Sequence, residues 1–173
     1  MKLTHILAKY KTDKLFHSYA PEYEVIFEEF KDSPEFTMLE IGVDKGGSLM
    51  AWKEYFPQGQ IWGVDNVDRR LPEYKTKDTN FVCGDINHVY LNRTWDIVID
   101  DGSHFLEDVL FVVKTYLPAL KPNGILIIED VQHPARWIRE IKEIVPEGYL
   151  MSVKDFREEK GHPEDFLIII KRV

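Results

Sequence analysis

The sequence predicts an α/β protein with a mostly parallel sheet of seven strands that ends in an antiparallel hairpin. Two observations favour this fold class. From residue 37 onward, short apolar segments of strand length alternate with segments of helical periodicity. Several of the strands are also nearly continuous in β-branched residues, as at residues 97–99, which is typical of strands covered on both faces.

Length, composition and charge limit the class of protein further. The 173 residues are 44% hydrophobic and contain no linker, so we expect a single domain with a substantial core. We expect a helical cover at residues 1–36 and a Rossmann-like core at residues 37–173. A net charge of −8 disfavours a nucleic-acid partner. One cysteine, Cys83, and the lack of a signal-like or membrane-spanning apolar run predict a soluble cytoplasmic protein.

The first 36 residues are predicted to form two helical pieces. Pro21 suits a first helical turn. Four apolar residues follow at helical spacing: Tyr23, Ile26, Phe27 and Phe30. Between the two pieces, residues 11–19 are polar and rich in hydrogen-bonding side chains, so they form either a solvated turn or a binding segment.

The rest of the chain alternates strands and helices. Strands are expected at residues 37–43, 60–66, 80–85, 95–101, 125–128, 150–153 and 166–170. Ser48 is expected to cap a helix that runs through Phe56. A helix of about four turns follows from Leu106, residues 122–124 form a turn, and Pro134 opens a last helix. The apolar side chains of that last helix are Trp137, Ile138, Ile141 and Ile144.

Carboxylates recur at the ends of the first five predicted strands. They are Glu40, Asp65, Asp85, the pair Asp100 and Asp101, and the pair Glu129 and Asp130. Because ligands of open parallel sheets bind beyond the carboxyl ends of the strands, these residues predict a ligand site at one edge. The alternative is an acidic rim without a ligand.

Three of these carboxylates, those of Asp101, Glu129 and Asp130, would repel one another unless protons, a basic side chain or a hard cation neutralised them. Mg²⁺ prefers such oxygen ligands. His104, three residues after Asp101, then suits a general base. In the alternative interpretation, Asp101 caps the following helix, Glu129 pairs with a lysine or arginine, and His104 has no catalytic role. The other histidines considered, at positions 17, 88, 133 and 162, are predicted to lie on the surface.

The turn after the first strand carries Gly42, Gly46 and Gly47 in a G-x-x-x-G-G spacing, which differs from the G-x-G-x-x-G of dinucleotide-binding folds. With Glu40 before it and Asp65 ending the next strand, the turn resembles motif I of class I S-adenosylmethionine-dependent methyltransferases. The resemblance implies that the methionine part of the cofactor passes Gly42, that Asp65 binds the ribose hydroxyls, and that Asp85 with Ile86 borders the adenine. Further cofactor contacts are expected from Thr12, Tyr19, Glu40, Ser48, Asn66 and Asp100.

Further motifs narrow the resemblance. They are T-D-K at 12–14, L-E-I-G-V at 39–43, W-K-E-Y-F-P at 52–57, I-D-D-G-S-H at 99–104 and I-E-D at 128–130. Together they are similar to the metal-dependent O-methyltransferases of macrolide sugars, of the macrocin and mycinamicin type. They are also similar to cephamycin-biosynthesis methyltransferase-like proteins, which are sometimes labelled cephalosporin hydroxylases. The resemblance implies that Asp101, Glu129 and Asp130 hold Mg²⁺ and that His104 is the base.

The sequence departs from that family in two expected features. The segment after Asp130, residues 131–134, is shorter than the family's substrate loop, and we expect no separate N-terminal domain. We therefore expect an S-adenosylmethionine- and Mg²⁺-dependent O-methyltransferase that acts on a small-molecule acceptor, a hydroxyl of a sugar or natural-product intermediate, within a homodimer. The alternatives are a cofactor-binding module without catalysis and a nucleotide-sugar or dinucleotide enzyme on a related sheet.

Overall fold

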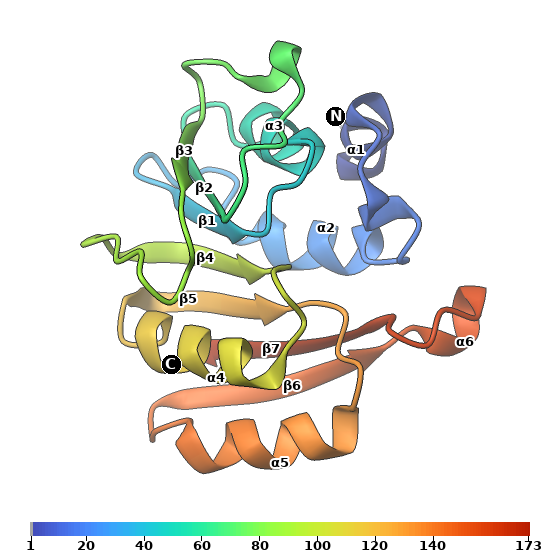
Figure 1. The fold of residues 1–173 in the computed structure, drawn as a ribbon, viewed down its shortest axis with the longest axis vertical. Helices are drawn as coiled ribbons and strands as arrows, with labels where there is room; N and C mark the ends of the chain where they lie inside the picture. The colour runs from blue at the N-terminus through green and yellow to red at the C-terminus, as the bar shows by residue number, and fades with distance from the viewer. Residues whose placement is uncertain (1) are drawn as a thin grey trace.

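The computed structural model describes residues 2–173 as a seven-stranded sheet between two layers of helices (Figure 1). The strands are β1 (Thr37–Ile41), β2 (Gln60–Asp65), β3 (Asn80–Cys83), β4 (Trp95–Asp100), β5 (Leu120–Ile128), β6 (Tyr149–Asp155) and β7 (Phe166–Arg172). The helices are α1 (Leu3–Tyr10), α2 (Ala20–Glu28), α3 (Gly47–Tyr55), α4 (Leu106–Tyr116), α5 (Pro134–Ile144) and α6 (Arg157–Lys160), with 3₁₀ turns η1 (Asp13–Leu15) and η2 (Pro72–Tyr74). None of the helices in this described part of the chain combines the length and the apolar composition needed to cross a membrane.

The strand order places a crevice at the middle of the sheet. The order is β3-β2-β1-β4-β5-β7-β6, in which β1 to β5 are mutually parallel and β7 is antiparallel to both β5 and β6. The mostly parallel sheet with its terminal antiparallel hairpin is therefore confirmed. The chain winds outward in opposite directions from β1 and β4, and in open parallel sheets ligands bind beyond the carboxyl ends of the strands at such a point.

The two faces of the sheet bury separate apolar clusters. Ile97 of β4 packs with Phe27 of α2 and Trp52 of α3, whereas the next residue, Val98, packs with Ile141 of α5. Adjacent strand residues point to opposite faces, so one strand supplies both clusters. The predicted N-terminal cover thus shares its core with the sheet and lies over the face opposite α4 and α5 (Figure 1).

Two local predictions were wrong. Ser48 does not cap α3, because Gly46 occupies the N-cap with φ 86° and Ser48 lies buried in the first turn. That left-handed backbone favours glycine over serine. Residues 122–124, predicted to form a turn, lie within β5 instead. Asn123 has φ 64° there, and the pairing register with β4 shifts between Trp95 and Ile97. This irregularity is a β-bulge near the start of β5.

Leu167 provides a test of the shared core. Its side chain in β7 is fully buried, so Leu167→Ala should lower the free energy of unfolding by about 2–5 kcal/mol through lost contacts and a cavity. Urea denaturation followed by circular dichroism measures the loss. The matched control is Leu150→Ala in β6, where the side chain is 63% exposed and the expected change is within about 0.5 kcal/mol. Equal losses in the two variants would contradict this description of the core.

Candidate functional site

A cleft of about 950 Å³ opens beyond the carboxyl ends of the parallel strands. Most of the predicted site residues line it: Thr12, Gly42, Ser48, Asp65, Asn66, Asp85, Ile86, Asp100, Asp101, His104 and Asp130. Tyr19, Glu40 and Glu129 do not. Glu40 is fully buried in β1, where its Oε1 accepts a hydrogen bond from Trp52 Nε1 at 3.1 Å, so its side chain lies in the core and not on the cleft surface. Carboxylates after β2, β3, β4 and β5 do meet at one edge, as predicted.

Gly42 joins the glycine-bearing turn to the turn after β4. Its backbone has φ 83°, and a Cβ atom at this position would lie 1.9 Å from the carbonyl oxygen of Asp101. In addition, the Asp101 backbone N–H donates to the Ile41 carbonyl at 2.9 Å. Any side chain at residue 42 would therefore push the two turns apart, which explains the glycine.

Asp65 organises the same glycine-bearing turn from the end of β2. Its Oδ2 accepts the backbone N–H groups of Val43 at 2.9 Å and Asp44 at 3.0 Å, and its Oδ1 accepts that of Val67 at 3.1 Å. A carboxylate has about four lone-pair sites, so Asp65 can hold the turn and still accept hydrogen bonds from ligand hydroxyls. The residue thus has a structural role in addition to the predicted binding role.

A hydrogen-bond network that the sequence analysis missed closes the far end of the cleft. Asn87 Nδ2 donates to Asp85 Oδ1 at 3.2 Å and to Asp108 Oδ1 at 2.9 Å. Ser103 Oγ donates to Asp108 Oδ2 at 2.5 Å. Asp108 of α4 therefore ties the loop after β3 to the loop after β4 and fixes the wall that contains Ile86.

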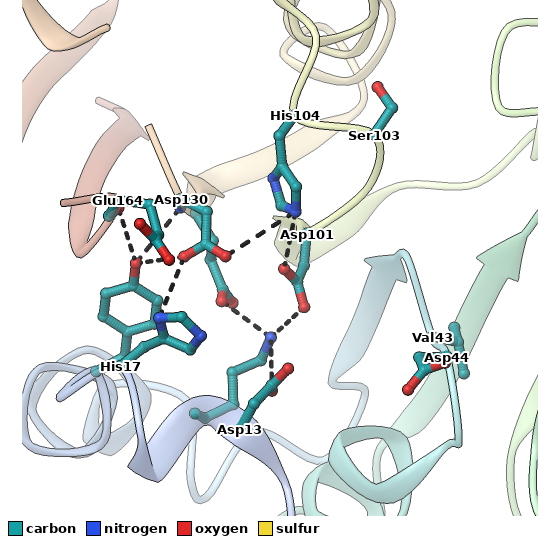
Figure 2. A network of polar contacts seen from close by, with 12 residues as sticks. Asp13, His17, Val43, Asp44, Asp101, Ser103, His104, Asp130 and Glu164 are labelled. Atoms are coloured by element: carbon teal, nitrogen blue, oxygen red, sulfur yellow. Dashed lines mark hydrogen bonds and ion pairs between the residues drawn. The ribbon is translucent and has the colours of Figure 1, made fainter. Parts of the chain in front are cut away.

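One ammonium group lies among the carboxylates at the ends of β4 and β5 (Figure 2). Lys14 Nζ donates to Asp101 Oδ2 and, at 2.9 Å, to Glu129 Oε2, while the Tyr23 hydroxyl donates to Glu129 Oε1. The alternative that Glu129 pairs with a lysine is therefore confirmed. The alternative for Asp101 is wrong, because Phe105 holds the N-cap position of α4.

Asp101 and Asp130 each direct one carboxylate oxygen toward His104 (Figure 2). His104 Nε2 lies 4.0 Å from Asp101 Oδ1 and 3.9 Å from Asp130 Oδ2, and one ligand atom from each of the three residues lies within 4.8 Å of the others. Asp130 Oδ1 is held by the Tyr19 hydroxyl at 2.6 Å. Two carboxylate oxygens beside an open cleft suit Mg²⁺, which is usually bound by one or two carboxylates and keeps positions for other oxygens. Glu129, predicted as a third ligand, lies outside this group.

Burial and the ammonium group of Lys14 shift the pKa values of the carboxyl groups in the site. Burial raises the pKa of Glu129 well above its usual range, and Lys14 opposes this shift. Burial alone would lower the pKa of Lys14, but Asp101 and Glu129 outweigh it and raise that pKa well above its usual range. Burial also raises the pKa values of Glu40 and Asp100 to about 7. Lys14 therefore stays charged and is the neutralising basic group whose identity the sequence analysis left open.

The N-terminal arm, residues 10–19, forms one wall of the site. It packs against the glycine-bearing turn, since a Cβ atom at Gly47 would lie 2.6 Å from the Tyr10 carbonyl oxygen. Thr12 Oγ1 is buried at this wall and has no hydrogen-bond partner within residues 2–173, as expected for a group that a ligand satisfies. Lys160 Nζ donates to the Phe16 carbonyl at 3.1 Å and so ties the arm to the segment before β7.

Two histidines predicted to lie on the surface are partly buried instead. His17 Nδ1 lies 2.8 Å from Asp165 Oδ1, and the His17 side chain is only 14% exposed. The ring of His162 is half-buried against Phe16, with centroids 4.0 Å apart. His17 and Asp165 are 148 residues apart, so no local pattern indicated their contact. His88 and His133 are exposed, as predicted.

Known proteins resemble this chain in sequence. No protein-family model matches it. Mycinamicin VI 2''-O-methyltransferase from Micromonospora griseorubida is 34% identical over 146 residues, and demethylmacrocin O-methyltransferase from Streptomyces fradiae is 34% identical over 145 residues. Each match covers 75% of this chain, whereas the chain spans only 36% of the length of each relative. The relatives are methyltransferases and favour neither alternative function.

Solved structures share the fold. The MycE methyltransferase of the mycinamycin pathway, in complex with Mg and SAH, matches with a TM-score of 0.76 at 24% identity, over 99% of this chain and 55% of that one. The SAM-bound amino pentose methyltransferase CalS10 from Micromonospora echinaspora matches with a TM-score of 0.69 at 11% identity, over 100% and 98% of the two chains. The predicted Rossmann-like class I methyltransferase fold is therefore confirmed.

Asp100 should make stability depend on pH. Its raised pKa means that, between about pH 4 and 7, the native state binds a proton that the unfolded chain has released, so stability falls as pH rises. Wild type should lose about 1.4 kcal/mol per pH unit more than Asp100→Asn between pH 5 and 6.5. Urea denaturation in EDTA at several pH values measures the difference. Parallel stability curves for the two proteins would contradict the buried state of this carboxyl.

Proposed function

We propose that this chain, which is similar in sequence to mycinamicin VI 2''-O-methyltransferase and demethylmacrocin O-methyltransferase and has the class I methyltransferase fold, methylates a hydroxyl group with S-adenosylmethionine and Mg²⁺. The proposed acceptor is a small molecule, a sugar or natural-product intermediate. One observation carries the proposal: Asp101 contacts the glycine-bearing turn through its backbone and belongs to the candidate metal group through its side chain. A methyl donor in the cleft and a metal-held hydroxyl would therefore be neighbours.

We propose that the cofactor lies along the cleft with its methionine part at Gly42, its ribose at Asp65 and its adenine between Asp85 and Ile86. The bare backbone at Gly42, the free lone pairs of Asp65 and the unpartnered Thr12 hydroxyl support this placement. The other proposed contacts come from Ser48, Asn66 and Asp100, which line the same cleft. Tyr19 and Glu40 are proposed to support the site from behind its wall.

The proposed reaction is an in-line displacement. Asp101 and Asp130 would hold the divalent ion, which would lower the pKa of the acceptor hydroxyl when bound. The acceptor oxygen attacks the methyl carbon, the bond from that carbon to sulfur breaks, and the hydroxyl proton passes to His104 Nε2. The 3.9–4.0 Å separations between His104 Nε2 and the two carboxylates exceed hydrogen-bond length and leave room for a hydroxyl beside all three groups.

The acceptor side of the site is proposed to be covered by the N-terminal arm and the segment at residues 157–165. The chain enters α5 only four residues after Asp130, so no long lid follows β5. We propose that a second copy of the chain completes the acceptor pocket. Light scattering tests this by measuring whether the molar mass in solution is that of a dimer. We also propose a cytoplasmic location, since the exposed free thiol of Cys83 suits a reducing compartment.

Ligand binding distinguishes this proposal from its rivals. Titration calorimetry should show binding of S-adenosylmethionine but not of NAD or nucleotide sugars, and the assays should be run with and without Mg²⁺. Incubation of a metabolite extract with methyl-labelled cofactor, followed by mass spectrometry, should then identify a labelled acceptor. Binding of the cofactor without transfer to any acceptor would favour the non-catalytic module.

Asp65→Ala should weaken S-adenosylmethionine binding by roughly 2–4 kcal/mol, because two hydrogen bonds to a charged group are lost. Calorimetry measures the dissociation constant, and thermal unfolding reports any loosening of the turn that Asp65 holds. Asp68→Ala is the matched control, since Asp68 lies in the same loop but does not line the cleft and pairs with Arg70. An unchanged dissociation constant for Asp65→Ala would remove this residue from the site.

His104→Ala should keep cofactor binding but slow methyl transfer by roughly 10²–10⁴-fold, the usual contribution of a general base. Single-turnover rates with the identified acceptor measure the effect. His133→Ala is the control, because that histidine is exposed and outside the cleft. Excess EDTA should abolish transfer by wild type, and full turnover in EDTA would disprove the metal assignment.

A further inference from the structure

Lys14 is the one buried lysine in residues 2–173. It comes from the short turn η1 in the N-terminal arm, its side chain is 1% exposed, and its ammonium group lies between Asp101 and Glu129. Asp13 lies 3.9 Å from the same nitrogen, but its side chain is 68% exposed, so solvent screens it. A lysine this deeply buried among carboxylates requires a physical reason, because taking an ammonium group out of water is expensive.

The contacts of Lys14 leave the metal group free. Lys14 binds Asp101 Oδ2 and Glu129 Oε2, whereas the oxygens nearest His104 are Asp101 Oδ1 and Asp130 Oδ2. The ammonium group and a metal ion would therefore use different oxygens of Asp101. The lysine need not leave for a metal ion to bind.

With the lysine included, the formal charge of the cluster equals that of a divalent ion in magnitude. In their ionised forms, Asp101, Glu129 and Asp130 supply three negative charges, and Lys14 supplies one positive charge, which leaves two negative charges. Without the lysine the cluster would have three, and each added negative charge attracts a trivalent ion more strongly than a divalent one. In a buried site such differences act at short range and with little screening.

We propose that Lys14 is a resident positive charge that sets the charge of the metal site and shifts its preference from trivalent toward divalent ions. The inference rests on the metal site of the proposed function. It assigns Lys14 a positioning and charge-setting role toward the metal and no contact with the reacting atoms. The ratio of affinities for a divalent and a trivalent ion reports this role, whereas a general loss of structure would weaken both ions alike.

A charge series tests the proposal. Glu129→Gln leaves one net negative charge, wild type has two, Lys14→Met has three, and the double variant Lys14→Met with Glu129→Gln returns to two. Dissociation constants for Mn²⁺, by electron paramagnetic resonance, and for Tb³⁺, by luminescence, are measured without cofactor or acceptor. The preference for Tb³⁺ over Mn²⁺ should change on the order of 10-fold per unit charge. It should rise in Lys14→Met, fall in Glu129→Gln, and return to the wild-type value in the double variant.

Lys121→Met is the matched control. Lys121 Nζ lies 2.7 Å from Asp96 Oδ2 at the opposite end of β4, so this variant removes the same charge far from the metal group. Its ion preference should equal that of wild type. If Lys14→Met fails to fold, the double variant, which removes the buried lysine together with its buried partner, is compared with Glu129→Gln and should show the higher Tb³⁺ preference.

The outcomes separate this inference from the proposed function. Binding of both ions with the wild-type ratio of affinities in folded Lys14→Met, or with the Glu129→Gln ratio in the double variant, would overturn the role of Lys14 alone. Equal strengthening of both ions in Lys14→Met would also overturn it, because the ammonium group would then simply compete for the site. If wild type binds neither ion, the metal site of the proposed function fails, and this inference fails with it.

Discussion

The site depends on one electrostatic constraint: carboxylates at the ends of β4 and β5 are withdrawn from water and need positive charge beside them. Glu129 is 2% exposed, and its burial is tolerable only because Lys14 and the Tyr23 hydroxyl donate to its two oxygens. The same lysine orients Asp101, so the N-terminal arm is part of the site as well as its cover. The helices on either side of the arm, α1 and α2, share the apolar core of the sheet, and this packing keeps the lysine in place.

A second constraint links the cleft to the metal group. The carbonyl of Asp101 lies where a Cβ atom of residue 42 would be, so the turns after β1 and β4 touch backbone to backbone. This contact arises at the point where the strand order changes direction, which is where a parallel sheet opens a crevice. The fold therefore brings the glycine-bearing turn and the carboxylates together without a dedicated loop.

Sequence patterns predicted the sheet and most of the cleft because both depend on local signals. Apolar runs followed by acids marked the strand ends, and Asp65, Asp85 and Asp130 line the cleft as predicted. The same reasoning failed for Glu40, whose place one residue before the end of β1 turns its side chain into the core toward Trp52. The prediction that His17 lies on the surface was wrong because its partner, Asp165, lies in a loop that is distant in the sequence.

The sequence by itself determined the order of strands and helices, the glycine-bearing turn and the set of acids at one edge, since each follows from neighbouring residues. Only the tertiary structure decided how those acids are used. Lys14 meets Asp101 across 87 residues and Glu129 across 115, and no periodicity connects positions so far apart. Which carboxylate pairs with the lysine and which faces the open cleft is therefore a property of packing, where a buried charge takes the nearest partner that the fold supplies.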